Sequence, residues 1–189
     1  AELRHVGVGV FWGEAAAKVS KAGSPEKADP LPAIVDFHEQ LKAMGIELIL
    51  APVPCKALVY ADKLGGATEG RLDTVHQEFY RLLAAKGVKV LDLADAFAKE
   101  KAKGPALYCK TDTHWSPYAC ELTARLIKDR LGSPAWLQTK PGVFKTATET
   151  RTIVGDLASG KGSEELPVRT VTGANDSASE DPASPVILL

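Results

Sequence analysis

An acid and an imidazole lie two residues apart at Asp112 and His114, just before a strong helix start. In an extended or turned segment their side chains project to similar sides, so the carboxylate can accept a hydrogen bond from the ring and fix its tautomer. That arrangement is the orienting acid and the general base of a nucleophilic triad. Ser116 and Pro117 are typical of the N-cap and first position of the helix that follows. The same Asp-x-His spacing also occurs in surface turns and in pairs of metal ligands.

The metal-site alternative needs a third and a fourth ligand, and no convincing donor motif in the sequence supplies them. The remaining histidines have no acid at a useful spacing; they are His5, His38 and His76. We therefore expect neither a metal nor another cofactor.

The cysteines also fit no zinc spacing; they are Cys55, Cys109 and Cys120. Their odd number leaves at least one thiol free. A bridge between Cys109 and Cys120 is conceivable, but a sequence cannot test the geometry that a disulfide requires. The disulfide status of all three stays open, and the cysteines indicate no redox compartment.

Length and charge restrict the class of protein. A chain of 189 residues is long enough for one domain with a real core and too short for two comfortable ones. With 23 Lys and Arg against 24 Asp and Glu, the chain has no general basic field, so we do not expect nucleic acid as a partner. No apolar run approaches the length of a membrane span.

Helix and strand patterns alternate along the chain. Apolar residues at helical spacing, bounded by capping residues and glycines, predict helices over residues 30–44, 71–86, 92–103 and 117–131. Continuous or Thr-rich runs predict strands over residues 46–53, 88–91 and 143–154, and an alternating run at 6–12 could be another. This alternation favours a doubly wound α/β fold. Residues 174–185 are polar and aperiodic, which is typical of a loop.

Three further side chains are candidates for substrate binding. Trp115 could stack on a sugar ring, or it could anchor the loop in the core. Lys56 and Tyr60 follow the predicted 46–53 strand, at the end where α/β proteins place ligands. They could line a cleft there; the alternative is a solvated lysine and a buried tyrosine.

Three segments resemble the alginate O-acetyltransferases of the AlgJ and AlgX type. Residues 112–117, Asp-Thr-His-Trp-Ser-Pro, resemble that family's Asp-x-His-Trp signature, which is the specific part of the match. Residues 45–60 are similar to its hydrophobic strand, Pro-x-Pro-x-Lys loop and tyrosine, and residues 155–157 are similar to a Gly-Asp-Leu segment. The resemblance runs from Leu31 to Leu189.

The resemblance implies an SGNH-hydrolase-like domain, which is a three-layer α/β/α fold with a mainly parallel sheet. It implies an O-acetyltransferase that acts on an exopolysaccharide such as alginate through an acetyl-serine intermediate. Asp112 would orient His114, and His114 would act as general base and acid. The partners would be a polysaccharide acceptor and an acetyl donor in the periplasm. Other proteins of an acetylation and export complex, and an inner-membrane attachment through a segment outside this chain, stay open.

The nucleophile of such a triad has no match in this sequence. Residues 186–189, Val-Ile-Leu-Leu, are typical of the start of a buried strand, which in the similar family leads into Gly-Asp-Ser. The Gly-Asp pair at residues 155–156 is followed by leucine, and the serines of the polar loops are ordinary loop residues. We therefore expect one catalytic domain over residues 1–189, incomplete at its C-terminal end, with the nucleophilic serine beyond Leu189.

Two other functions fit the same residues. A carbohydrate O-acetylesterase would use the same chemistry with water as the acceptor. A non-catalytic polysaccharide-binding scaffold of an export complex would need no nucleophile. The sequence does not set the acceptor sugar, the acetyl donor or the oligomeric state.

Overall fold

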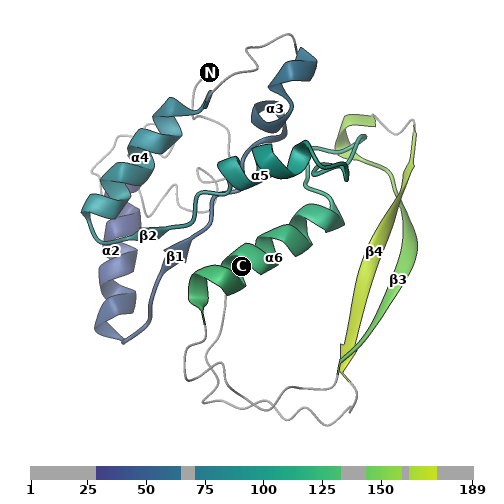
Figure 1. Ribbon diagram of the computed structural model, residues 1–189. Coiled ribbons are helices and arrows are strands. Elements are labelled where there is room, and N and C mark those ends of the chain that lie inside the picture. The colour runs from purple at the N-terminus through teal and green to yellow at the C-terminus, as the bar shows by residue number, and fades with distance from the viewer. Residues whose placement is uncertain (1–28, 65–70, 133–143, 159–161, 174–189) are drawn as a thin grey trace. The chain divides into compact units, whose positions relative to one another are not determined.

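The computed structural model describes residues 29–64, 71–132, 144–158 and 162–173. They belong to two compact units (Figure 1). The first is built from Ala1–Val53 and Ala61–Asp92, and the second from Pro54–Tyr60 and Leu93–Leu189. The expectation of a single domain over the whole chain stays a prediction.

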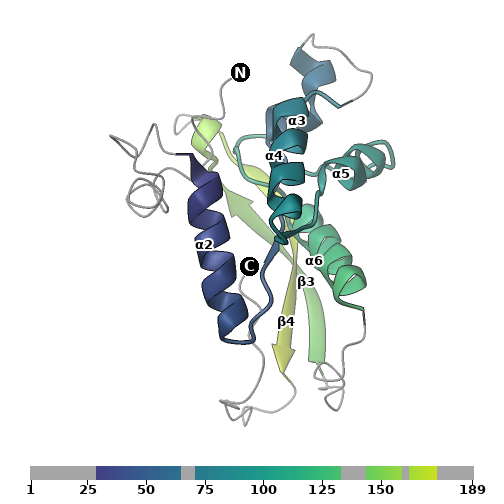
Figure 2. The ribbon, with the colours of Figure 1, turned by 90° about the vertical axis from the view of Figure 1, so that its left-hand side faces the viewer.

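The first unit combines helices with a short parallel pair of strands. Its elements are α2 (Pro30–Ala43), β1 (Ile49–Leu50), η3 (Ala61–Leu64), α4 (Thr74–Ala85) and β2 (Lys89–Val90). The strands pair in parallel over Ile49 with Lys89 and Leu50 with Val90. Helix α4 contacts both α2 and β2, and Figure 2 shows the two helices along their length. Leu83 and Val88 are almost fully buried in this unit.

The second unit contains the Asp-His segment. Its elements are α3 (Lys56–Val59), α5 (Ala94–Lys101), α6 (Pro117–Leu131), β3 (Phe144–Ile153), η5 (Asp156–Ala158) and β4 (Glu164–Gly173). Strands β3 and β4 form an antiparallel hairpin that is paired over ten residues of each strand (Figure 2). Helix α6 contacts β4, and α3 contacts α5. Phe97 and Leu107 are fully buried and form part of the core.

The predicted cap of helix α6 is confirmed. Ser116 is in an extended conformation, and its hydroxyl accepts a hydrogen bond from the N–H of Ala119 at 3.2 Å. The same hydroxyl donates to the carbonyl of Ala106 at 2.6 Å, so the cap also ties the helix to the preceding segment. Gly132 ends the helix with a φ of 68°, a conformation that favours glycine. The hydrogen bonds of Ser116 therefore fix the direction in which the Asp-His segment enters α6.

Several sequence predictions need correction or stay open. The strand predicted over residues 46–53 is limited to Ile49–Leu50, because only these residues pair with β2. Strand β4 is not among the strands that the sequence predicted. The longer pairing among the described residues is antiparallel, so a mainly parallel sheet stays a prediction. The predicted strand at residues 6–12, the loop at 174–185 and the apolar run at 186–189 lie outside the described residues. None of the described helices is long and apolar enough to cross a membrane.

Candidate active site

The segment that contains Asp112 and His114 is a tight loop whose two ends are paired with each other. Tyr108 and Trp115 form an isolated antiparallel bridge across its base. The N–H of Cys109 donates to the carbonyl of His114 at 3.2 Å, inside that bridge. We call residues 109–114 the Asp-His loop. Because its two ends are paired to each other, the loop presents its side chains as one unit at the start of α6.

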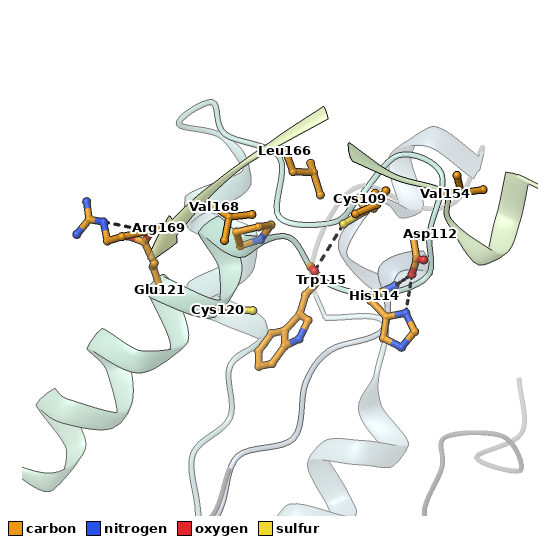
Figure 3. A pocket seen from close by; sticks show the side chains of 12 residues that line it. Cys109, Asp112, His114, Trp115, Cys120, Glu121, Val154, Leu166, Val168 and Arg169 are labelled. Atoms are coloured by element: carbon orange, nitrogen blue, oxygen red, sulfur yellow. Dashed lines mark hydrogen bonds and ion pairs between the residues drawn. The ribbon is translucent and has the colours of Figure 1, made fainter. Parts of the chain in front are cut away.

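The Asp112 carboxylate makes two contacts with His114 through one oxygen. Oδ1 accepts the backbone N–H of His114 at 2.8 Å and lies 2.5 Å from the ring Nδ1 (Figure 3). The first contact closes an Asx-turn, in which the side chain of an aspartate accepts the backbone N–H two residues further along the chain. The second is the predicted hydrogen bond between acid and imidazole, and this geometry is confirmed. The catalytic roles of the two residues stay predictions.

The charge of Asp112 indicates which nitrogen of the His114 ring carries the proton. The backbone N–H of His114, followed by its ring, lowers the pKa of Asp112 below the usual range of a carboxyl. Asp112 is therefore a carboxylate at neutral pH and can only accept hydrogen bonds, so Nδ1 must carry the shared proton. The neutral ring then has a lone pair on Nε2, which has no hydrogen-bond partner within the described part of the chain. The side chain of His114 is 78% exposed, so Nε2 is open to a substrate or a nucleophile.

The turn that follows β3 is hydrogen-bonded to the Asp-His loop. The N–H of Leu157 donates to the carbonyl of Thr111 at 2.9 Å, and the N–H of Asp156 donates to Asp112 Oδ2 at 3.1 Å. The Asp156 carboxylate accepts the N–H of Thr113 at 2.7 Å and also the hydroxyl of Thr113. The Gly-Asp-Leu segment at residues 155–157 is part of the family resemblance, which assigned no role to it. In the structure it immobilises the second carboxylate oxygen of Asp112.

The contact between this turn and the loop leaves no room for a side chain at Gly155. A Cβ at Gly155 would lie 2.0 Å from the carbonyl oxygen of Thr111 and 2.7 Å from the backbone nitrogen of Asp112. Both atoms belong to backbone, which cannot rotate away as a flexible side chain would. We therefore expect Gly155→Ala to separate the turn from the loop. Overpacking of this kind costs about 1–3 kcal/mol of stability.

The measurements for Gly155→Ala are the melting temperature and the amide spectrum of residues 111–114. We expect a lower melting temperature and shifted amide signals throughout that segment. Gly45→Ala is the control, because the added methyl would meet nothing within 4 Å while the residue keeps a φ of +75°. It should lower stability through backbone strain alone and leave the loop signals in place. Unchanged loop signals in Gly155→Ala would show that the turn does not hold the loop.

Asp156 also completes a group of three possible metal ligands. One ligand atom from each of Asp112, His114 and Asp156 lies within 4.8 Å of the others. Only two of these ligands are recognisable from sequence spacing, because Asp156 is 44 residues away from Asp112. The oxygen atoms already accept hydrogen bonds from the loop and the turn, as described above, so the observed contacts fit an oriented histidine. The expectation of no metal stays a prediction.

An open pocket of about 700 Å³ lies beside the pair. Its walls are largely apolar, with Trp115, Val154 and Leu166 among them, and the ion pair of Glu121 with Arg169 lies at one side (Figure 3). The predicted substrate contact of Trp115 is compatible with this position, since its half-buried side chain lines the pocket. Its part in binding a sugar stays a prediction.

The other two predicted substrate residues occupy different positions. Lys56 and Tyr60 are not among the residues that line this pocket. The Lys56 ammonium donates to three backbone carbonyls of the Asp-His loop. The Tyr60 hydroxyl accepts the N–H of Leu107 at 3.0 Å, just before the base of the loop. Both are half-buried, so neither the solvated lysine nor the fully buried tyrosine of the alternative interpretation is observed.

Of the two cysteines that line the pocket, Cys109 and Cys120, the first is a poor nucleophile for His114. Cys109 is only 4% exposed, and its thiol points to the carbonyl of Trp115 at 3.7 Å. Burial, followed by the charges of Glu164 and Asp112, raises the pKa of the Cys109 thiol. A thiol must ionise to attack, so these surroundings keep it unreactive. All three cysteines are free, and the bridge between Cys109 and Cys120 that the sequence left open is not formed.

Comparison with known proteins gives consistent matches. A family model described as the SGNH hydrolase-like domain of the acetyltransferase AlgX matches residues 11–182. The probable alginate O-acetylase AlgJ of Pseudomonas syringae pv. tomato is 31% identical over 137 residues, which are 71% of this chain and 35% of that protein. The AlgJ protein of Pseudomonas aeruginosa, with the same description, is 33% identical over 65% of this chain and 32% of its own length. The chain thus spans about a third of the length of these two curated relatives.

Solved structures show the same likeness. The O-acetyltransferase domain of Pseudomonas putida AlgJ matches with a TM-score of 0.61 and 26% identity, over 75% of this chain and 55% of that one. Pseudomonas aeruginosa AlgX matches with a TM-score of 0.56 and 16% identity, over 74% of this chain and 37% of that one, which shows likeness of fold.

Proposed function

This chain belongs to the family of SGNH hydrolase-like domains of the acetyltransferase AlgX, and on that basis we propose that it takes part in O-acetylating an exopolysaccharide such as alginate. The family model and the solved relatives also support an SGNH-hydrolase-like fold. The observation that most supports an enzymatic role is the contact between Asp112 Oδ1 and His114 Nδ1, at 2.5 Å, beside an open pocket. It leaves the lone pair of Nε2 available as a general base.

In the proposed reaction, His114 Nε2 takes the proton of a serine hydroxyl as the serine oxygen attacks the acetyl carbonyl of the donor. The bond between the acetyl carbon and the donor oxygen then breaks, and the leaving alcohol takes the proton from Nε2. A sugar hydroxyl next attacks the acetyl-serine, gives its proton to Nε2, and releases the serine, which recovers the proton. Asp112 stabilises the imidazolium that forms twice in this cycle.

The serine of this proposal lies on a Gly-Asp-Ser turn, a sequence that these 189 residues do not contain. The open Nε2 of His114 supports a nucleophile contributed from outside the described residues. The proposal also includes a periplasmic location and an export complex around the enzyme. The family resemblance supports the location, and relatives named as alginate biosynthesis proteins support the pathway, such as AlgX of Pseudomonas putida.

An assay with separate donor and acceptor readouts tests the proposal. The full-length protein is incubated with p-nitrophenyl acetate and mannuronate oligosaccharides, and both nitrophenol release and acetylated sugar are measured. An acetyltransferase gives both products, and His114→Ala loses both. His76→Ala is the control, because His76 stacks on Tyr80 in the first unit and should leave both products unchanged.

The alternatives give different patterns in the same assay. Nitrophenol release without acetylated sugar would identify an O-acetylesterase, which shares the residues and uses water as its acceptor. Sugar binding without any release of nitrophenol would favour a binding scaffold and contradict the proposed enzyme.

A further inference from the structure

Three carbonyl groups of the Asp-His loop converge on one cation. The Lys56 ammonium donates to the carbonyls of Cys109 at 2.7 Å, Lys110 at 3.2 Å and Asp112 at 2.9 Å. An ammonium group has three protons and no acceptor, so three carbonyls use all of its donors. None of these protons remains for a carboxylate or hydroxyl of a substrate.

Three N–H groups of the same loop donate instead to the carboxylates of two residues outside it. Glu164 Oε2 accepts the N–H groups of Lys110 at 2.6 Å and Thr111 at 3.0 Å. The Asp156 carboxylate accepts the N–H of Thr113, as described above. The backbone of the loop therefore runs between one cation on its carbonyl side and two carboxylates on its amide side. Charge-assisted hydrogen bonds of this kind are shorter and stronger than neutral ones.

The cation contacts the backbone of the residue that orients the histidine. Asp112 is bonded through its own carbonyl to Lys56, through Oδ1 to His114 and through Oδ2 to the N–H of Asp156. If the ammonium is removed, the partly buried carbonyls of Cys109 and Asp112 and the exposed carbonyl of Lys110 lose this donor. Among the described residues, the peptide group that follows Asp112 is then held only through the N–H of Thr113, so it can rotate more easily. A rotation of this backbone moves Oδ1 away from the ring of His114.

We propose that Lys56 is a positioning residue, whose ammonium fixes the backbone of the Asp-His loop so that Asp112 holds the Nδ1–H tautomer of His114. This role differs from the substrate contact that the sequence suggested for Lys56. The expected effect on turnover rests on the proposed function, whereas the expected effect on the His114 ring does not.

The first test observes the ring directly. Nitrogen-15 spectra of the imidazoles distinguish a ring that is protonated on Nδ1 from one that is protonated on Nε2. We expect the single Nδ1–H form of His114 in the unmodified protein and a mixture of tautomers in Lys56→Met. Lys101→Met is the matched control, because the Lys101 ammonium also donates to a backbone carbonyl, that of Val59 at 2.9 Å. It should leave the His114 signals unchanged.

The second test separates positioning from substrate binding by kinetics. A misplaced general base lowers kcat by about 10²-fold with little change in KM, whereas a lost substrate contact raises KM. Lys56→Arg sharpens the distinction because it keeps the charge. A planar guanidinium cannot direct three N–H groups at three converging carbonyls, so the arginine variant should fail as the methionine variant does. If Lys56 instead bound a carboxylate of the substrate, the arginine variant would keep that contact and retain its activity.

The results that overturn the proposal are specific. An unchanged His114 tautomer in Lys56→Met would contradict the positioning role. A KM that is raised in Lys56→Met and normal in Lys56→Arg would show that Lys56 contacts the substrate instead. If Lys56→Met does not fold, the tautomer and the kcat of Lys56→Arg decide the question. A full-length protein that lacks turnover altogether contradicts the proposed function, and the imidazole spectra then still test the role of Lys56.

Discussion

In the full-length protein, Asp112→Asn will retain its fold and lose about 10⁴-fold in acetyl-transfer turnover, the loss that the same change causes in a serine-protease triad. The asparagine amide can still contact the ring, but it favours the wrong tautomer and cannot stabilise an imidazolium. The structure adds that Asp112 accepts the backbone N–H of His114 at 2.8 Å and that of Asp156 at 3.1 Å. The amide oxygen of asparagine can keep one of these two bonds.

Melting temperature and turnover must be measured on the same preparation of Asp112→Asn. If the residue orients His114, turnover collapses while the melting temperature and acceptor binding stay close to those of the unmodified protein. If Asp112 is mainly structural, the melting temperature falls by many degrees and activity falls only in proportion to the folded fraction. Asp129→Asn is the control, because Asp129 is exposed on α6, far along that helix from its capped start.

The 189-residue chain by itself is expected to give no turnover of acetyl esters above background. Loss of the attacking group of a triad typically removes a factor of about 10⁶ from kcat. No Gly-Asp-Ser occurs in the chain, and within the described residues no hydroxyl or thiol bonds to His114 Nε2. The measurement is hydrolysis of p-nitrophenyl acetate, with His114→Ala as the background. A robust rate that disappears in His114→Ala would place the nucleophile inside these residues.

The helices were largely predictable because their signals are local. A serine before a proline, and a glycine sixteen residues after that serine, set both ends of α6. An aspartate cap and a glycine did the same for α2. Strands lack such signals, because a strand exists only where a partner pairs with it. Residues 46–53 are apolar over most of their length, yet β1 extends only over Ile49–Leu50. Strand β4 was missed because it begins with two glutamates and contains Pro167, and an internal proline argues against a strand. Its pairing with β3 identifies it.

The candidate site likewise contains residues that local spacing predicted and residues that it could not predict. Asp112 and His114 were found from a spacing of two residues, and their contact is formed by a local turn. Lys56 and Glu164 contact the same loop from 53 to 56 residues away in sequence, on either side of it. No spacing rule predicts that a lysine will donate to backbone carbonyls so distant in the chain. The sequence therefore identified the candidate reacting groups, while the residues that support them became visible only in the folded chain.

The exposure of His114 bears on how an acetyl group would be divided between a sugar and water. With 78% of its side chain exposed, the imidazole could activate a water molecule as readily as a sugar hydroxyl. Water is far more concentrated than any acceptor, so an acetyl-serine next to this ring would be hydrolysed unless water were displaced. A bound sugar chain that covers the ring would itself remove that competitor. The ratio of transfer to hydrolysis would then depend on how long the acceptor remains bound, and longer oligosaccharides should be acetylated with less wasted donor.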